Sequence, residues 1–541
     1  MFSTSHIFIV KFIGCRLNFS LNFRVFLLLV LIAFTIFVFT NDGHRYSFDE
    51  DVTQRQAEWI VNQQPHPNFK EGESTVFFDY PELWPNGRSG SVCKIGIICS
   101  AAYVGHSFTQ IPFILINENL NIINNEDIWT IEDFDSPHYV WWRNSIDSNF
   151  TFMELFYGPI FSSFAVGFLF LICRNLNFRL NSSILVSILF ALTTITWAYS
   201  QTSLSSVPMV SLNLLAFLFF IRFQKTIKLR YLIFSGLTMG FAFNTRPDSI
   251  LIIFVIGLFL FYFIAKQFKK GNTKQEISKI VQKLTSFGIP IISSVLIFQL
   301  INFLRFETSV TYSGFSASTS TIFTPAYISL FGLLFSPGLG LFIFSPILFI
   351  SIISFYDYFQ KDKANFFLII GIIVSFLVWF TVFIVYWHGL VGWSARYLLP
   401  IVPFLMIPLA SSFEKRSSKF FIASIVVLAS LGFFFNITYL IQDVSWFVWG
   451  QMGEAFGLYG LPSDGGPLRI SPMTIWTFEF SQLTHTIYLA FNHLQPDLYL
   501  LKIFGGITYS ISLFSILSIL SYFLIKTTRN TMYNKISDKS N

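Results

Sequence analysis

Charged residues of this 541-residue chain gather just beyond its apolar segments, where they could carry out chemistry. The first group is three consecutive acids, Asp49, Glu50 and Asp51, which follow the first apolar run by a few residues. A carboxylate at a membrane surface can act as general base toward a hydroxyl or hold a divalent cation. The structural alternative is that these acids begin a helix over 52–61, because the N-terminal end of a helix favours negative charge.

Two arginines lie where apolar segments meet. Arg246 is part of Asn244-Thr245-Arg246-Pro247-Asp248, and Arg396 is part of the stretch 392–400. A guanidinium group presents a fork of donors that suits phosphate. The local alternatives are an ion pair between Arg246 and Asp248, and a snorkelling Arg396 within an aromatic belt. If both arginines lie near the acids, the three groups favour a phosphate-bearing lipid as ligand.

Several other polar residues of the same segments are candidate substrate contacts. They are Arg45, Asp51, His106, Arg143, Asp248, His388 and Tyr397. No spacing of Cys and His indicates a zinc site, so no metal-ligating residue is predicted. No cofactor is predicted with certainty, and a Mg²⁺ or Mn²⁺ ion is compatible with the acids.

The composition indicates which elements must position these residues. The chain is 53% apolar and only 12% charged, whereas soluble domains have about 25% charged residues. These values exclude a disordered chain and predict an all-α polytopic membrane protein. We predict about twelve transmembrane helices, within a range of 11–13: 25–41, 154–173, 181–199, 203–221, 231–245, 248–265, 285–304, 337–356, 365–386, 397–412, 420–440 and 503–525.

The distribution of charge predicts an orientation. If the N-terminus is inside and the spans alternate, the inside segments hold 24 of the 35 Lys and Arg residues. In the same arrangement 24 of the 29 acids lie outside or at the outer edge. The excess of cations inside predicts that both termini are cytoplasmic. The net charge of +6 therefore belongs to loops beside anionic lipids, and no nucleic-acid partner is expected.

This topology divides the chain into a short inner tail, a membrane domain and a basic inner tail, which are 1–24, 25–525 and 526–541. Two long outer segments result, 42–153 and 441–502, and we expect the chemistry there because long loops are uncommon unless functional. The stretch 95–116 has no charged residue but contains Ser, His, Thr and Gln. We therefore expect it to form an interfacial or re-entrant helix covered by protein rather than a further span.

In combination, these features resemble the GT-C class of membrane glycosyltransferases, which includes protein O-mannosyltransferases and lipid A aminoarabinose transferases. The matching stretches are Asp49-Glu50, Thr245-Arg246-Pro247, 332–346 and 392–400. The resemblance implies a sugar donor carried on a polyprenyl phosphate, with a multi-pass cell-membrane location and an active site on the outer face. It also implies that Asp49 is the catalytic base with Glu50 in support, and that Arg246 and Arg396 bind the donor phosphate.

The resemblance implies a hexosyl or pentosyl transfer, with inversion, to an extracytoplasmic protein, lipid or glycan. One alternative is a polymerase or ligase of lipid-linked glycans, for which we expect key residues in a late outer loop. Arg469, Glu479 and His485 are the residues that keep this alternative open. A secondary transporter is a weaker alternative, because it requires ionisable residues near the membrane midplane and few are found.

Overall fold

The structure is a computed structural model. It describes residues 20–44, 48–62, 90–92, 98–100, 103–120, 151–267, 273–306, 324–384, 387–388, 392–442, 459–460, 469–470 and 472–540. Each of the twelve predicted apolar segments contains helix in this part of the chain. The structure therefore confirms an all-α polytopic architecture, to which the described residues add two short antiparallel strand pairs.

Nine helices of the described residues are long and apolar enough to cross a membrane. They are Leu21–Phe39, Phe152–Asn175, Ser206–Thr226, Pro247–Lys266, Ile277–Ile301, Lys363–Phe383, Arg396–Lys415, Lys419–Leu440 and Gly506–Arg529. Nine of the twelve predicted spans coincide with these helices. The predicted total of about twelve, the cytoplasmic termini and the domain limits stay predictions.

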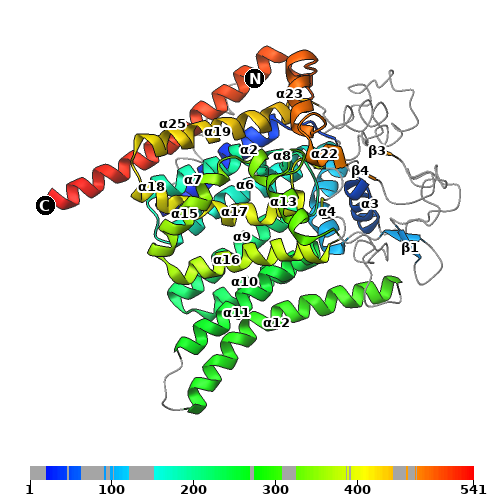
Figure 1. Ribbon diagram of the computed structural model, residues 1–541. Coiled ribbons are helices and arrows are strands. Elements are labelled where there is room, and N and C mark those ends of the chain that lie inside the picture. Colours follow the sequence, from blue (N-terminus) through cyan, green and yellow to red (C-terminus); the bar gives the residue numbers. More distant parts are fainter. Residues whose placement is uncertain are drawn as a thin grey trace.

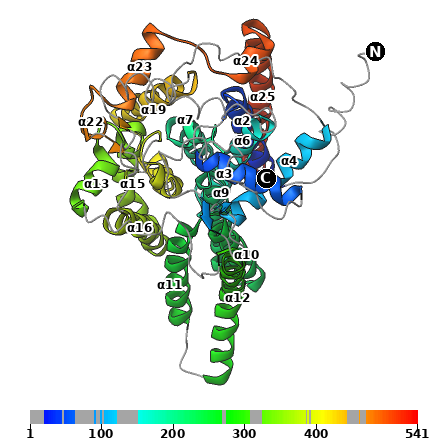
Figure 2. The same ribbon diagram turned by 90° about the vertical axis from the view of Figure 1, so that its right-hand side faces the viewer.

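The first half of the chain forms a bundle in which most helices pack against others of the same half. Its elements are α2 (Leu21–Phe39), α6 (Thr151–Asn175), α7 (Leu180–Thr193), α8 (Thr196–Tyr199), α9 (Ser206–Thr226), α10 (Leu229–Thr245), η3 (Pro247–Ser249), α11 (Ile250–Gln267) and α12 (Thr273–Phe306). Small residues allow close approach of α10 and α12, since a Cβ atom on Gly236 would lie 2.5 Å from the carbonyl oxygen of Phe287. Figure 2 shows α11 and α12 extending together beyond the rest of the bundle.

The second half is interrupted more often, as its Gly and Pro residues predict. Its elements are α13 (Ala326–Phe335), α14 (Leu341–Phe344), α15 (Leu348–Lys361), α16 (Lys363–Val378), η4 (Trp379–Phe383), η5 (Arg396–Ile401), α17 (Val402–Met406), α18 (Leu409–Lys415), α19 (Lys419–Leu440), α22 (Pro472–Trp476), α23 (Gln482–Asn492), α24 (Tyr499–Phe504) and α25 (Gly506–Ser540). The break after α13 is fixed by a backbone bond from Gly338 N to the carbonyl oxygen of Ile475, at 3.0 Å.

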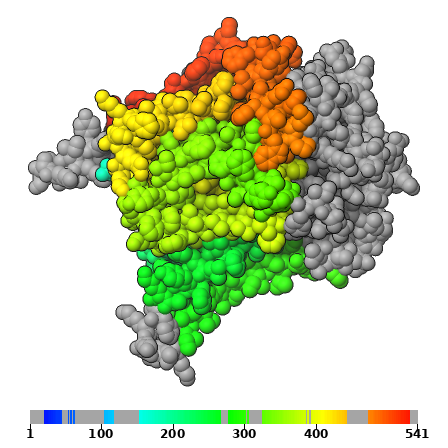
Figure 3. Space-filling view, viewed as in Figure 1, coloured from blue at the N-terminus to red at the C-terminus, as the bar shows by residue number. Residues whose placement is uncertain are grey.

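Large apolar side chains are exposed on several of these helices. Phe367 on α16 and Phe420 on α19 are exposed, and Figure 3 shows the yellow and green face that these helices help to form. In the membrane-length apolar stretches of α12 and α25, only 11% of the residues are buried inside the protein. Exposed apolar surface of this extent is typical of helices that contact lipid.

Several elements of the two long predicted outer segments lie at one end of the molecule. They are α3 (Phe48–Val61), β1 (Gly90–Val92), β2 (Ile98–Ser100), α4 (Val104–Leu120), β3 (Tyr459–Gly460) and β4 (Arg469–Ile470). Strand β1 pairs with β2, and β3 pairs with β4. Figure 1 shows these elements on the right, whereas the basic C-terminal end of α25 lies on the far left. Two segments that are distant in the sequence thus share one end of the bundle.

The charge-free stretch 95–116 forms β2 and most of α4. Helix α4 packs against α3, α6 and α10, and it is not among the span-length apolar helices of the described residues. Its polar side chains are buried against protein, as expected of a helix that does not face lipid; these are His106, Ser107, Thr109 and Gln110.

Candidate functional site

Arg246 and Arg396 meet at a single tyrosine ring. The guanidinium carbon of Arg246 lies 5.5 Å from the centre of the Tyr397 ring, and that of Arg396 lies 5.3 Å from it. The two guanidinium carbons can therefore be no farther apart than the sum of these distances. Phe380 stacks on the same ring at 4.8 Å and so fixes its orientation. We call Arg246, Arg396, Tyr397 and the neighbouring Tyr199 the arginine–tyrosine cluster.

Two chain turns bring these arginines together. Arg246 ends α10 with extended backbone angles, as expected of a residue that precedes proline, and Pro247 then begins η3. On the other side, Gly392 precedes η5 and lies against α8, where a Cβ atom would come within 2.9 Å of the Tyr199 hydroxyl. Glycine is therefore required for this close approach.

The local ion pair that the sequence offered as an alternative is also present. Arg246 Nε donates to Asp248 Oδ2 at 2.6 Å, and both side chains are largely buried. This interaction uses one of the five N–H groups of the guanidinium. The pair therefore orients Arg246 toward Tyr397. This structural role does not exclude phosphate binding by the other N–H groups of the same guanidinium.

Tyr199 is a member of the cluster that the sequence analysis did not identify. It is buried at the end of α8, and its hydroxyl donates to the carbonyl oxygen of Trp393 at 3.0 Å. This bond uses the single O–H group of the phenol, so Tyr199 fixes the turn beside the two arginines. No motif in the sequence around Tyr199 marks this position.

His388 adds no charge to the cluster. Burial lowers its pKa to about 4, and the positive charge of Arg396 contributes in the same direction. The imidazole is thus neutral near pH 7. It lies beside Trp387, with the ring centres 5.7 Å apart.

Glu50, predicted to support the catalytic base, is fully buried and holds a distant loop. Its Oε1 accepts hydrogen bonds from the backbone N–H of Ser203 at 2.7 Å and from the Ser203 hydroxyl at 3.4 Å. Gln54, one helical turn further along α3, donates to the same hydroxyl at 2.8 Å. These contacts fix α3 against the turn between α8 and α9, so Glu50 positions the helix that contains Asp49. The side chains of Asp49, Asp51, Arg45 and Arg143 lie outside the described residues.

His106 holds the same turn from the other side. Its Nε2 lies 2.8 Å from the carbonyl oxygen of Ser203. A carbonyl oxygen only accepts, so Nε2 carries the proton. Burial lowers the pKa of His106 to about 3; the bond to Ser203 opposes this shift, and the charge of Arg246 adds to it. The imidazole is neutral and connects α4 to the turn, which places it near the arginine–tyrosine cluster.

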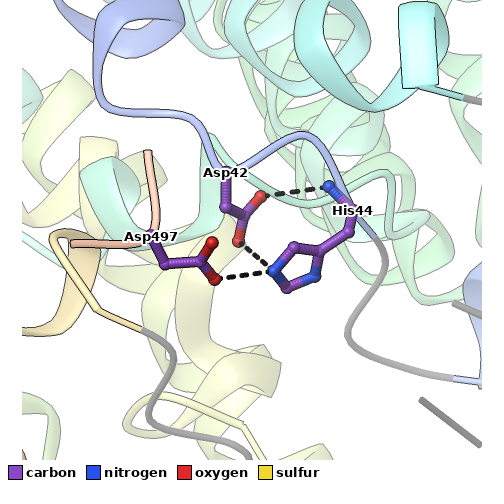
Figure 4. Close-up of side chains that lie close together, drawn as sticks. All are labelled: Asp42, His44 and Asp497. Atoms are coloured by element: carbon purple, nitrogen blue, oxygen red, sulfur yellow. Dashed lines mark hydrogen bonds and ion pairs between the residues drawn. The ribbon is translucent and has the colours of Figure 1, made fainter. Parts of the chain in front are cut away.

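A second cluster combines residues from both ends of the chain. Figure 4 shows Asp42, His44 and Asp497 pointing toward one another. His44 Nε2 lies 2.8 Å from Asp497 Oδ2 and 3.6 Å from Asp42 Oδ2, and all three residues are buried. We call them the carboxylate–histidine cluster. Among the described residues, these are the side chains whose arrangement could hold a metal ion.

Lys502 also contacts this cluster. Its Nζ lies 2.6 Å from Asp497 Oδ1. Burial tends to raise the pKa of Asp497, but His44 and Lys502 outweigh this effect and lower it, so the carboxylate is ionised. No sequence motif marks these four residues, because Asp42 and His44 are separated from Asp497 and Lys502 by most of the chain.

One comparison with known proteins agrees with the resemblance seen in the motifs. Residues 151–298, which run from α6 into α12, match the family described as dolichyl-phosphate-mannose-protein mannosyltransferase. The match covers about a quarter of the chain, and within it the resemblance to GT-C membrane glycosyltransferases is confirmed. The matched residues include Arg246 and Asp248, but they include neither Arg396 nor the acids at positions 49–51. No curated protein matches the chain.

Two solved structures are similar in part. The oligosaccharyltransferase of Archaeoglobus fulgidus in the apo form is 11% identical, with a TM-score of 0.44 over 86% of this chain and 64% of that one. The oligosaccharyltransferase AglB of the same organism, in complex with an inhibitory peptide and a dolichol-phosphate, is 11% identical, with a TM-score of 0.41 over 86% and 63%. The chain thus spans less than two thirds of their length, and likeness at these TM-scores supports no inference about activity.

Proposed function

We propose that this protein transfers a sugar from a polyprenyl-phosphate carrier to an acceptor on the outer face of a membrane. The family match over 151–298 motivates the lipid-linked donor, since that family is described by a dolichyl-phosphate-mannose donor and a protein acceptor. A protein acceptor is accordingly our first choice, ahead of a lipid or a glycan. The sugar is a hexose or a pentose.

The observation that carries this proposal is the approach of Arg246 and Arg396 to one ring, that of Tyr397. Breaking the bond between sugar and phosphate leaves negative charge on the phosphate. Preorganised guanidinium groups stabilise that charge as it develops, and they act strongly where water is excluded. The cluster is therefore suited to bind the donor phosphate and to stabilise it as leaving group.

The acceptor side of the reaction is assigned to the first acids. In the proposed step, Asp49 removes the proton of the acceptor hydroxyl, whose oxygen attacks the anomeric carbon while the bond to phosphate breaks. A single displacement of this kind inverts the configuration at that carbon. Glu50 is the positioning residue, because its bonds to Ser203 fix the helix that contains Asp49. The lipid tail would enter sideways between the spans.

The test is transfer from a polyprenyl-phosphate sugar by the full chain in lipid nanodiscs, comparing Arg246→Gln and Arg396→Gln. Removing one preorganised donor of this type lowers turnover by about 10²–10³-fold. Arg230→Gln is the matched control: Arg230 also lies over a tyrosine, 5.1 Å from the ring centre of Tyr231, but at the opposite end of α10. If Arg246→Gln and Arg396→Gln transfer the sugar as fast as the control Arg230→Gln, the cluster is not the phosphate site.

A polymerase or ligase of lipid-linked glycans is the second candidate. The observation that favours it is the contact of the late segment with the first loop, where Asp497 meets both His44 and Lys502. The same assay separates the two functions by acceptor. Transfer to a peptide supports the protein glycosyltransferase, whereas transfer only to a second lipid-linked glycan supports the polymerase or ligase.

A further inference from the structure

We propose that the carboxylate–histidine cluster, Asp42, His44 and Asp497, binds a divalent transition-metal ion such as Zn²⁺. An imidazole nitrogen with two carboxylate oxygens is a ligand set that zinc uses in proteins, and a water or substrate atom completes the tetrahedron. The site is independent of the proposed sugar transfer. It lies where the loop after α2 meets the segment before α24.

The distances between the ligand atoms fit one ion. Zn–N and Zn–O bonds are about 2.0–2.2 Å long, so two ligand atoms of a tetrahedral site lie about 3.4 Å apart. His44 Nε2 is 2.8 Å from one carboxylate oxygen and 3.6 Å from the other, values on either side of this separation. All three ligand atoms lie within 4.8 Å of one another. Small side-chain rotations would therefore suffice to bind the ion.

Each carboxylate has a second partner that holds one of its oxygens. Lys502 Nζ contacts Oδ1 of Asp497, and the backbone N–H of His44 donates to Oδ1 of Asp42 at 3.4 Å. The Oδ2 atoms of both carboxylates face His44 Nε2 (Figure 4). Outer partners of this kind orient metal ligands and commonly accompany natural metal sites.

The backbone holds the ligands in place independently of their side chains. Tyr499 N donates to the carbonyl oxygen of Asn41 at 3.0 Å, and Asp497 N donates to that of Ile441 at 2.9 Å. Gly43 has a φ of +80° and lies against the Tyr499 ring, where a Cβ atom would come within 2.9 Å. Asp42 and His44 are thus presented on a tight turn beside Asp497. A preformed site of this kind avoids much of the cost of ordering its ligands.

The arrangement places two buried carboxylates against one imidazole nitrogen, with Lys502 as a positive charge beside Asp497. A cation bound at this nitrogen would add further positive charge between the carboxylates. Buried carboxylates are costly unless they are paired or bind a cation. The competing occupant is a proton, which would make His44 an imidazolium ion. Metal content and metal affinity distinguish these two occupants.

The experiment is zinc binding to the full chain purified in detergent. After EDTA treatment and its removal, the wild-type protein is titrated with Zn²⁺, and bound zinc and the melting temperature are measured. We expect one Zn²⁺ per chain and a rise in melting temperature. Asp497→Asn and His44→Gln each weaken binding by at least about 10-fold, the lower end of the loss seen when even an outer partner is removed.

The matched controls are His485→Gln and Asp362→Asn, which change the same residue types elsewhere, in α23 and at the N-cap of α16. Both should bind zinc as the wild type does. If the wild type binds no zinc and EDTA leaves its melting temperature unchanged, the proposal is wrong and the cluster holds a proton. A negative wild-type titration contradicts the proposal whether or not the variants fold. Wild-type zinc affinity in both Asp497→Asn and His44→Gln would place the ion elsewhere and would also overturn it. Sugar transfer is not measured, so the result is independent of the proposed function.

Discussion

The arginine–tyrosine cluster and the carboxylate–histidine cluster are opposite solutions to placing charge near apolar helices. The first surrounds one aromatic ring with two guanidinium groups and so attracts an anion. The second surrounds one imidazole with two carboxylates and so attracts a cation. Both consist of side chains that a lipid environment would penalise if they were unpaired.

The two clusters differ in how the chain assembles them. The arginines come from helix ends, at sequence motifs where Pro or Gly interrupts the helical pattern. The carboxylate–histidine cluster joins a turn after α2 to the segment before α24, and His44 and Asp497 are 453 positions apart. Residues in local motifs, such as the two arginines, can therefore be recognised in a sequence. Residues that meet only through a long-range contact, such as His44 and Asp497, cannot.

The largest effect is expected on the catalytic base, on the helix that begins four residues after His44. Asp49→Asn should lower turnover by about 10²–10⁴-fold, the usual contribution of general acid–base catalysis, with donor binding retained. Turnover and donor affinity are measured separately in nanodiscs. Glu58→Gln on the same helix is the control. Normal turnover in Asp49→Asn would remove Asp49 from the mechanism and leave catalysis to the arginine–tyrosine cluster alone.

Glu50 allows a test of positioning without chemistry. In Glu50→Ala the backbone N–H of Ser203 loses its buried acceptor, which costs about 1–3 kcal/mol in the free energy of unfolding. Glu50→Gln keeps an oxygen that can accept this bond and should be closer to wild type. The melting temperature of each variant is compared in one detergent. Equal destabilisation by both variants would show that charge, and not the hydrogen bond, is what matters.

Gly43→Ala should disturb the carboxylate–histidine cluster alone. A positive φ costs a residue with a side chain about 1–2 kcal/mol, and the added Cβ would also meet the Tyr499 ring. Gly505→Ala is the control, because Gly505 has a φ of +72° with nothing within 4 Å of its Cβ position. The difference in melting temperature between the two isolates the contact with Tyr499. A loss of donor affinity in Gly43→Ala would mean that the two clusters are coupled.

The smallest effect is expected at the ring between the arginines. Tyr397→Leu removes the cation–π contacts of Arg246 and Arg396, each worth about 0.5–1 kcal/mol, so donor affinity should fall several-fold. Tyr397→Phe keeps the ring and should bind as the wild type does. Tyr231→Leu removes the equivalent ring beside Arg230 and should leave donor affinity unchanged. If Tyr397→Leu has no effect either, the ring does not position the arginines.

The sequence alone was sufficient for the helices, for a local physical reason. Twenty or so apolar residues must form a helix in lipid to satisfy their own backbone groups, so each predicted segment contains helix. The motifs around Arg246 and Arg396 were also visible, because proline and glycine mark helix ends wherever they occur. The GT-C resemblance rested on the same short stretches.

Only the tertiary structure determined which of these residues meet. That Arg246 and Arg396 share Tyr397, that Glu50 is bound by Ser203, and that Asp497 reaches His44 depend on how the helices pack. Tyr199 and Ser203 have unremarkable sequence neighbours, since their roles come from partners in other helices. Local patterns arise from the chain's own hydrogen bonds and solvation. A site arises from contacts between segments, and those contacts leave no periodic signal in one sequence.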